Sequence, residues 1–144
     1  MNARYLFRAK RIDNGELIEG FLIFEKDRAF IAHRVCEVMN SYSKAGEEYG
    51  FGNFIEVDPS TICQCTGLKD KNGDMVFEND MMSAHLDDYF PEDITYARVI
   101  WGDTGYCLRE KDSIDIQPLE EIDMEYFTVC GNVFDNPELL EQEV

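Results

Sequence analysis

The chain has 144 residues and a formal net charge of −17, from 30 acidic and 13 basic side chains. Hydrophobic residues make up 44% of it, which is enough for the core of one ordinary domain and argues against global disorder. A field this negative repels nucleic-acid phosphates and anionic membranes, and no apolar run reaches the roughly 18–20 residues of a membrane span. Direct nucleic-acid binding and membrane insertion are therefore not expected.

The N-terminal part of the sequence predicts a hairpin. Residues 1–12 are the first strand, and residues 17–24 are the return strand. Between them, Asn14 and Gly15 suit the two positive φ angles of a type I′ turn. Gly20 within the second strand indicates a bulge or close packing.

Many short strands are expected after this hairpin. Residues 28–42 fit helical and strand spacing about equally well, and we interpret them as a strand followed by a loop, with a glycine-rich surface loop at 43–53. Further strands are predicted at 54–57, 60–66, 75–77, 95–101, 106–108 and 127–134. The segment TYARVIW, residues 95–101, alternates with period 2 and is followed by the Gly102–Gly105 turn, which indicates a second hairpin.

A short helix is expected at the end of the chain. Asp135 or Asn136 can cap it, and Pro137 suits its first position. Many short strands with little helix indicate an antiparallel-rich α+β fold. We expect one domain over residues 1–144, with a finer division into an N-terminal subdomain 1–58 and a β-rich subdomain 59–144.

Five cysteines stand at positions 36, 63, 65, 107 and 130. The N-terminus lacks the apolar segment and the cleavage site of a secretory signal, so reduced thiols and a cytoplasmic location are expected. Cys63 and Cys65 share one face of a strand, but no second pair at zinc spacing accompanies them. Filling of the core is favoured over a metal site or a catalytic thiol.

Acidic residues offer two further candidate sites. Asp70, Asp74, Glu78 and Asp80 resemble a loose calcium loop, but Met81 stands at the twelfth position, where an EF-hand needs glutamate. Turn formation explains the same residues. His85 near Asp87 and Asp88 could form a base with an orienting carboxylate, but a solvated loop is favoured. No catalytic residue, metal ligand or cofactor is predicted.

Three stretches together resemble the YopX-like family of bacteriophage and prophage proteins. They are STICQCTGLKDKNGDMVFENDMM at 60–82, VCGNVFDNPELL at 129–140 and RYLFRAKRIDNGELIEGFLI at 4–23. We recognise no motif of the family in residues 24–53 and 83–118. The resemblance implies an α+β architecture with a small barrel-like β region, in the cytoplasm of a bacterial host cell. It implies no assigned activity and no catalytic residues.

The sequence departs from the family pattern at Asn79. Glycine usually stands at this place, between Glu78 and Asp80. Asparagine is the next best residue for a positive φ angle, so Asn79 is predicted to adopt the left-handed conformation. A role for this position in the backbone is therefore favoured over one that needs the absence of a side chain.

The charge is divided unevenly along the chain. Residues 1–34 carry seven basic and five acidic side chains, a net of +2, whereas residues 85–144 carry three and sixteen, a net of −13. This acidity either keeps the protein soluble or presents a surface to a basic protein partner, in the sharper form as a DNA mimic. The split also suggests a homo-oligomer in which Arg4, Arg8 and Arg11 of one subunit meet the acidic region of another.

Two functions are therefore considered. The first is a non-enzymatic phage accessory protein that acts through protein contacts. The alternative is a small metal-dependent hydrolase or nucleotide-binding enzyme that uses Asp and Glu carboxylates. Three or more carboxylates that converge in one pocket would favour the enzyme.

Overall fold

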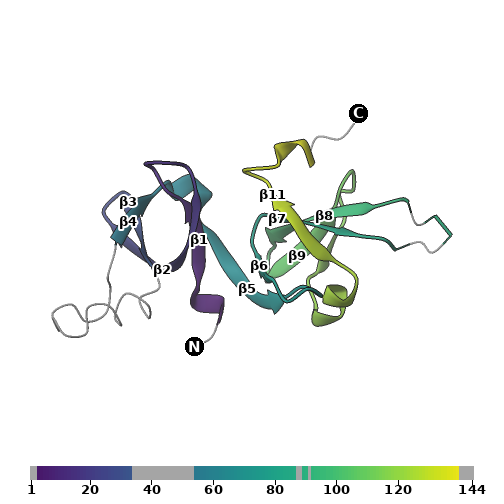
Figure 1. The fold of residues 1–144 in the computed structure, drawn as a ribbon. Helices are drawn as coiled ribbons and strands as arrows, with labels where there is room; N and C mark the ends of the chain where they lie inside the picture. The colour runs from purple at the N-terminus through teal and green to yellow at the C-terminus, as the bar shows by residue number, and fades with distance from the viewer. Residues whose placement is uncertain (1–2, 34–53, 87–88, 91, 140–144) are drawn as a thin grey trace. The chain divides into compact units, whose positions relative to one another are not determined.

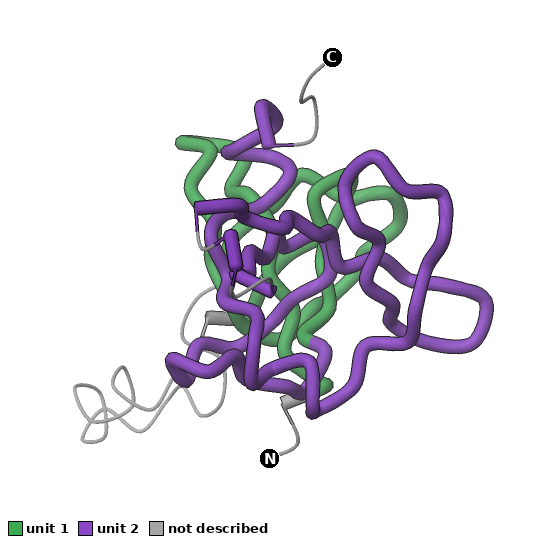
Figure 2. Tube along the Cα trace, turned by 90° about the vertical axis from the view of Figure 1, so that its right-hand side faces the viewer, with its two compact units in different colours: residues 1–65 green, residues 66–144 purple. Residues whose placement is uncertain are grey.

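A computed structural model describes residues 3–33, 54–86, 89–90 and 92–139 (Figure 1). The chain divides into two compact units, residues 1–65 and 66–144 (Figure 2). The described strands are β1 Phe7–Lys10, β2 Leu17–Glu25, β3 Arg28–His33, β4 Phe54–Val57, β5 Cys63–Lys69, β6 Met75–Phe77, β7 Asp80–Ala84, β8 Thr95–Trp101, β9 Tyr106–Glu110, β10 Ile116–Pro118 and β11 Thr128–Asn132. Four 3-10 turns accompany them: η1 Ala3–Tyr5, η2 Pro59–Thr61, η3 Glu121–Glu125 and η4 Pro137–Leu139.

Unit 1 is built on antiparallel pairs in the order β4-β3-β2-β1-β5. Its core consists of buried Ala9, Ala29, Ile31 and Val57, with partly buried apolar side chains around them. Gly20 pairs with Phe7 on one side and His33 on the other, and a Cβ atom there would collide with the Ala32 carbonyl oxygen. The close packing predicted at Gly20 is confirmed.

The turn of the first hairpin differs from the predicted type I′. Gly15 has a φ of 75°, but Asn14 is absent from the positive-φ residues, so the two positive angles of that turn are not both present. The Asn14 side chain instead accepts a hydrogen bond from the Glu16 backbone N–H at 2.9 Å. Asparagine competes for the backbone in this way at many turns, which explains the difference.

The strand β5 belongs to both units. Cys63 pairs with Arg8 of β1 in unit 1, and β6 is the neighbour of β5 on its other side. After this strand the chain forms the second sheet, in the order β10-β9-β8-β7-β11, in which the paired strands are antiparallel.

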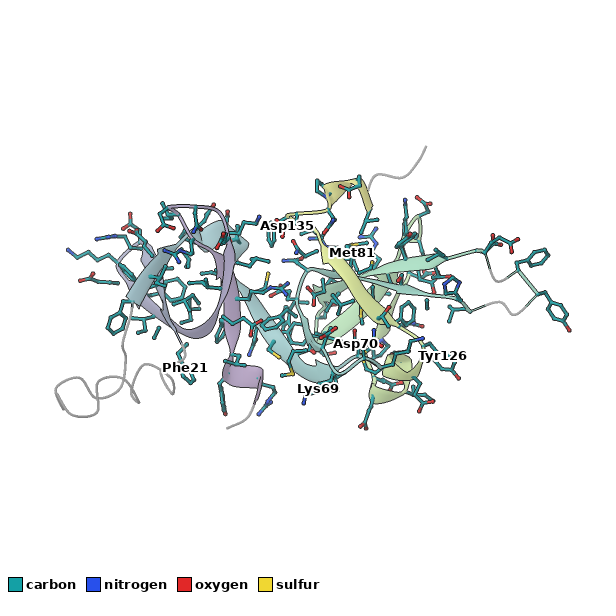
Figure 3. The ribbon with its side chains drawn as sticks, viewed as in Figure 1. Phe21, Lys69, Asp70, Met81, Tyr126 and Asp135 are labelled. Carbon is teal, nitrogen blue, oxygen red and sulfur yellow. The ribbon has the colours of Figure 1, made fainter. Side chains whose placement is uncertain are left out.

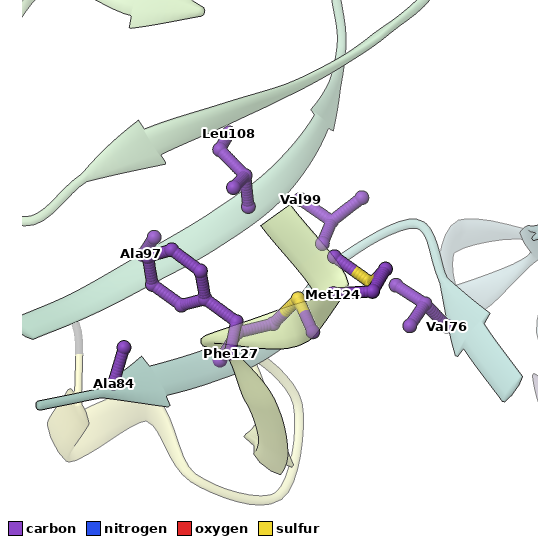
Figure 4. Packing of buried hydrophobic residues seen from close by; sticks show 8 residues of the cluster. Val76, Ala84, Ala97, Val99, Leu108, Met124 and Phe127 are labelled. Atoms are coloured by element: carbon purple, nitrogen blue, oxygen red, sulfur yellow. The ribbon is translucent and has the colours of Figure 1, made fainter. Parts of the chain in front are cut away.

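The core of unit 2 lies on one face of this second sheet. Alternate residues of β7, β8 and β9 point into it, while β6 supplies Val76, η3 supplies Met124 and the segment after η3 supplies Phe127 (Figure 4). The strand residues are Met82, Ala84, Ala97, Val99 and Leu108. Strict alternation therefore sends Met81, Arg98 and Arg109 to the opposite face.

The predicted α+β class is wrong, because the structure is nearly all antiparallel β-sheet. The segment expected to form a C-terminal helix is the single 3-10 turn η4 in its described part, with residues 140–144 outside. The Asn136 side chain, expected as a helix cap, instead accepts a hydrogen bond from the Asn132 backbone N–H at 3.1 Å. So short a segment also lacks the roughly 12–15 residues that an independent helix needs.

The barrel-like region is also wrong. Both sheets are open, and one isolated bridge between Arg11 and Val57 does not extend into a ladder that would close a barrel within the described residues. The strand predicted at the start of residues 28–42 is confirmed as β3, and the loop predicted after it and the one at 43–53 lie outside the described residues. In the part of the chain that the structure describes, no helix is long and apolar enough to cross a bilayer.

Candidate functional site

A row of side chains crosses the face of the second sheet that is opposite its core. Met81 of β7 is the register partner of Arg98 on β8, and Arg98 is the partner of Arg109 on β9. Figure 3 shows Met81 within unit 2. Two arginines thus stand directly opposite one another across the β8–β9 hairpin, an arrangement that is destabilising for like charges.

These arginines line a pocket of about 350 Å³ in unit 2. Lys111, at the turn after β9, also lines it. Arg98, Arg109 and Lys111 are the three basic residues of segment 85–144, which also carries sixteen acidic residues. The strongest concentration of positive charge in the acidic part of the chain is therefore confined to one pocket.

The two guanidinium groups are held by neutral acceptors. Arg98 donates from Nε and Nη2 to the Asn79 side-chain oxygen at 3.3 and 2.8 Å. Arg109 donates from Nε to the Ser113 carbonyl at 2.9 Å. Among the described residues, neither guanidinium forms an ion pair with a carboxylate.

Lys111 is fixed by the turn that follows β9. Its backbone N–H donates to the Tyr96 carbonyl at 2.8 Å, and Asp112 adopts a φ of 67° as Ser113 bonds back to Glu110. The Lys111 Nζ is shielded from solvent and has no hydrogen-bond partner within the described ranges. Burial of an ammonium group without an acceptor is unfavourable, so this atom is poised for an anionic oxygen.

Apolar and acidic side chains complete the pocket. Met81 is only 1% exposed and belongs to its floor, while Ile100 and Ile114 give it apolar walls. Glu110 and Asp112 also line it, so three positive and two negative side chains meet there. The arrangement suits a ligand that combines an anionic group with an apolar part.

A second exposed surface surrounds η3. Glu120, Glu121 and Glu125 are exposed there, together with Ile122 and Tyr126, which are 58% and 53% exposed. Figure 3 shows Tyr126 beside η3. The backbone of this turn is closed by Asp123, whose carboxylate accepts the Glu120 N–H at 2.8 Å. We call these five exposed side chains the η3 surface.

The predicted cysteine pair lies in the interior. Cys63 and Cys65 are both 0% exposed on β5, which confirms the interpretation that they fill the core. Cys130 is exposed; its thiol donates to the Met81 carbonyl at 3.4 Å, and partial burial of the sulfur raises its pKa. A raised pKa keeps this thiol protonated at neutral pH, which is unfavourable for a nucleophile. Cys36 lies outside the described residues.

The acids of the calcium-like segment serve the backbone. Asp70 is buried and accepts from the Asn72 and Asp74 N–H groups, each at 2.9 Å, while its second oxygen accepts from Val129 at 2.9 Å. Asp80 is buried and accepts from the Phe77 N–H at 2.8 Å. The predicted role in turn formation is confirmed for Asp70.

The predicted cluster around His85 stays untested by the structure. Asp87 and Asp88, the predicted partners of His85, lie outside the described residues. In the described ranges no group of three or more His, Cys, Asp or Glu side chains could hold a metal ion. Sequence reasoning missed the cationic pocket, because Arg98, Arg109 and Lys111 were counted only within the overall charge.

Comparison with known proteins places the fold and the family. The solved structure of protein EF1440 from Enterococcus faecalis is similar over 94% of this chain and 96% of its own, with a TM-score of 0.52 and 22% sequence identity. At this identity the likeness concerns the fold alone. A comparison with curated proteins gave no match.

The fold and sites define an all-β protein of two units with a cationic pocket in an acidic second unit. The profile of the YopX protein family matches residues 6–141, which is most of the chain. The chain belongs to the YopX family, and the resemblance found from its sequence motifs is confirmed.

Proposed function

We propose that this YopX-family protein acts by binding rather than by catalysis, as a phage or prophage accessory protein whose η3 surface contacts a basic protein partner. The observation that carries the proposal is the pairing of three exposed carboxylates with exposed Ile122 and Tyr126 on one short turn. Large exposed apolar side chains at one place are typical of contact surfaces.

The two kinds of side chain would have different tasks in such a contact. Ile122 and Tyr126 supply apolar area that is removed from water, and tyrosine is common among residues that dominate binding energy. Glu120, Glu121 and Glu125 steer a positively charged partner and select against an acidic one. Because rim charges act over distance, the association rate should fall as salt rises.

The test uses the tagged full chain as bait in a lysate of its bacterial host. We expect Ile122→Ser with Tyr126→Ser, and separately Glu121→Lys with Glu125→Lys, to abolish capture of a basic protein that the unchanged chain retains. The matched control is Asp74→Lys with Asp103→Lys, two exposed acids elsewhere in unit 2 with the same change in charge.

Two outcomes would contradict the proposal. Equal loss of capture in the control would indicate unspecific attraction between charges. Capture that survives both η3 substitutions would place the contact elsewhere. Release of the captured protein by duplex DNA would support the sharper form, a DNA mimic. Among the described residues, no observation favours the alternative of a metal-dependent hydrolase or nucleotide-binding enzyme.

A further inference from the structure

We infer that the pocket lined by Arg98, Arg109 and Lys111 is a binding site for a small organic monocarboxylate that carries an apolar group. This inference goes beyond the contact at the η3 surface, since it concerns a different ligand and a different place in unit 2.

The placement of the three cations favours an anionic ligand. Residues 66–144 contain twenty acidic and five basic side chains, yet three of the five line one pocket without a carboxylate ion pair among the described residues. Arg98 and Arg109 face each other in register, which costs stability unless an anion lies between the charges. Such an arrangement is expected where an anion is bound.

The hydrogen-bond donors of the pocket also favour an anionic ligand, and among anions a carboxylate. Arg109 is exposed; its Nε bonds to the Ser113 carbonyl, which orients the side chain, while its two Nη groups make no hydrogen bond to the described residues and stay open to solvent or to a ligand. The Lys111 Nζ, in contrast, is buried without an acceptor among the described residues. A carboxylate offers two oxygens at the spacing of a guanidinium fork, and such charge-assisted hydrogen bonds are the strong ones.

The lining selects the class of anion. Three positive and two negative side chains leave a net charge of one, so a monoanion is balanced, whereas a dianionic phosphate would also meet Glu110 and Asp112. The apolar Met81, Ile100 and Ile114 favour a ligand with an apolar body. A volume of about 350 Å³ lies at the lower end of the range for small-molecule sites.

The test is a titration of the full chain with benzoate at about 0.15 M salt, where charges beyond about 8 Å are screened. Binding is monitored through the NMR chemical shifts of the backbone amides. Benzamide is the neutral probe of nearly the same shape, and inorganic phosphate is the dianionic probe. We expect benzoate to shift the amides of residues 98–100 and 109–114, with benzamide and phosphate at least tenfold weaker.

Matched substitutions complete the experiment. Arg109→Gln should weaken benzoate binding by about tenfold to a hundredfold, the range for loss of a charge-assisted hydrogen bond. Arg109→Lys should recover only part, because it keeps the charge and loses the fork. Lys71→Gln removes the same charge from an exposed turn and should leave benzoate binding unchanged. Thermal melting of each variant verifies that it is folded.

Several outcomes would overturn the inference. The first are binding of benzamide as tight as that of benzoate, tighter binding of phosphate, or amide shifts located outside the pocket. The others are no benzoate binding up to about 10 mM (weaker than about −3 kcal/mol), or an equal loss of benzoate affinity in Arg109→Gln and Lys71→Gln. Because the readout is a small molecule on the isolated chain, its failure would leave the η3 contact untouched, and failure of that contact would leave the pocket untouched.

Discussion

Asn79 has two roles, one in the backbone and one through its side chain. Its φ of 71° confirms the left-handed conformation predicted from its place in the family motif. Its backbone bonds to Val99 and Val133 at 2.8 and 3.0 Å, which ties the turn before β7 to two other segments. Its side-chain oxygen also holds Arg98, a contact that the sequence did not indicate.

Substitutions at Asn79 should separate these roles. Asn79→Val should lower the free energy of unfolding by about 1–2 kcal/mol, because a β-branched residue is strained at positive φ. Asn79→Gly favours the positive φ angle but removes the acceptor of Arg98, so the net change in unfolding free energy should be close to zero. Urea denaturation of the two variants checks this, and an equal loss in both would contradict a conformational role.

Asn132 organises the segment from Gly131 to Pro137 in this chain. The Asn132 side chain is buried, and its oxygen accepts from the Phe134 and Asp135 N–H groups, each at 2.9 Å. Its amide donates to the Asp135 carboxylate at 3.2 Å. Gly131 has no room for a Cβ atom, because the Asn136 side chain lies against it. The hydrogen bonds of this segment therefore fix its backbone conformation.

Truncation of the Asn132 side chain should destabilise the folded protein. Asn132→Ala leaves two backbone N–H groups without their acceptor, and each loss of this kind costs about 1–3 kcal/mol. We expect a decrease of about 2–4 kcal/mol in unfolding free energy, with the benzoate affinity of the folded protein unchanged. Asp135→Ala, which removes a more exposed partner, is the control and should cost less. A larger loss in the control would contradict the central place of Asn132.

At the scale of elements, local patterns were sufficient where both strands of a pair lay next to their turn. The hairpin predicted from TYARVIW and the Gly102–Gly105 turn is confirmed as β8 and β9. The predicted C-terminal helix failed, because a hydrogen-bond network between Asn132 and Asn136 determines the local backbone. Capping residues alone could not reveal this competition.

The same hairpin contained a signal for the candidate pocket. Trp101 pairs with Tyr106 beside the turn, and counting outward from that pair places Arg98 opposite Arg109. The sequence alone could thus have predicted the arginine pair. It could not have predicted Lys111 or the acceptor Asn79 beside them, because the turn at Asp112 and the neighbouring strand β7 are set by contacts distant in sequence.

The opposed arginines should reduce the stability of the ligand-free protein. Arg109→Gln removes the like charge opposite Arg98, so it should raise the unfolding free energy by about 0.2–1 kcal/mol. Urea denaturation without benzoate checks this, with Lys71→Gln as the control for the change in net charge. A decrease in stability specific to Arg109→Gln would show that its bond to Ser113 outweighs the repulsion.

At the scale of the whole molecule, the self-association suggested by the charge split stays a prediction. We expect an oligomer at micromolar concentration in low salt, weakened when Arg4, Arg8 and Arg11 are all changed to Glu. Arg11 already pairs with Asp13 at 2.7 Å, so Arg11→Glu alone should have little effect. Light scattering decides the matter, and a monomer under these conditions would contradict the prediction.

Charge and core are divided in the same place along the chain. The apolar cluster around Ile31 lies wholly within unit 1, and the cluster around Val99 lies wholly within unit 2. Residues 1–65 carry eight basic and ten acidic side chains, a net of −2, whereas residues 66–144 carry five and twenty, a net of −15. Repulsion between like charges should therefore destabilise mainly the core of unit 2.

Salt should consequently stabilise unit 2 more than unit 1. Raising the ionic strength from about 0.01 to 0.1 M shortens the screening length from about 30 to 10 Å, which weakens repulsion among separated carboxylates. We expect amide hydrogen exchange in β8 and β9 to slow by a larger factor than in β2 and β3. Since chloride bound in the cationic pocket would act in the same direction, the comparison is repeated with Arg109→Gln. An equal response of both sheets would mean that the two cores open as one cooperative unit.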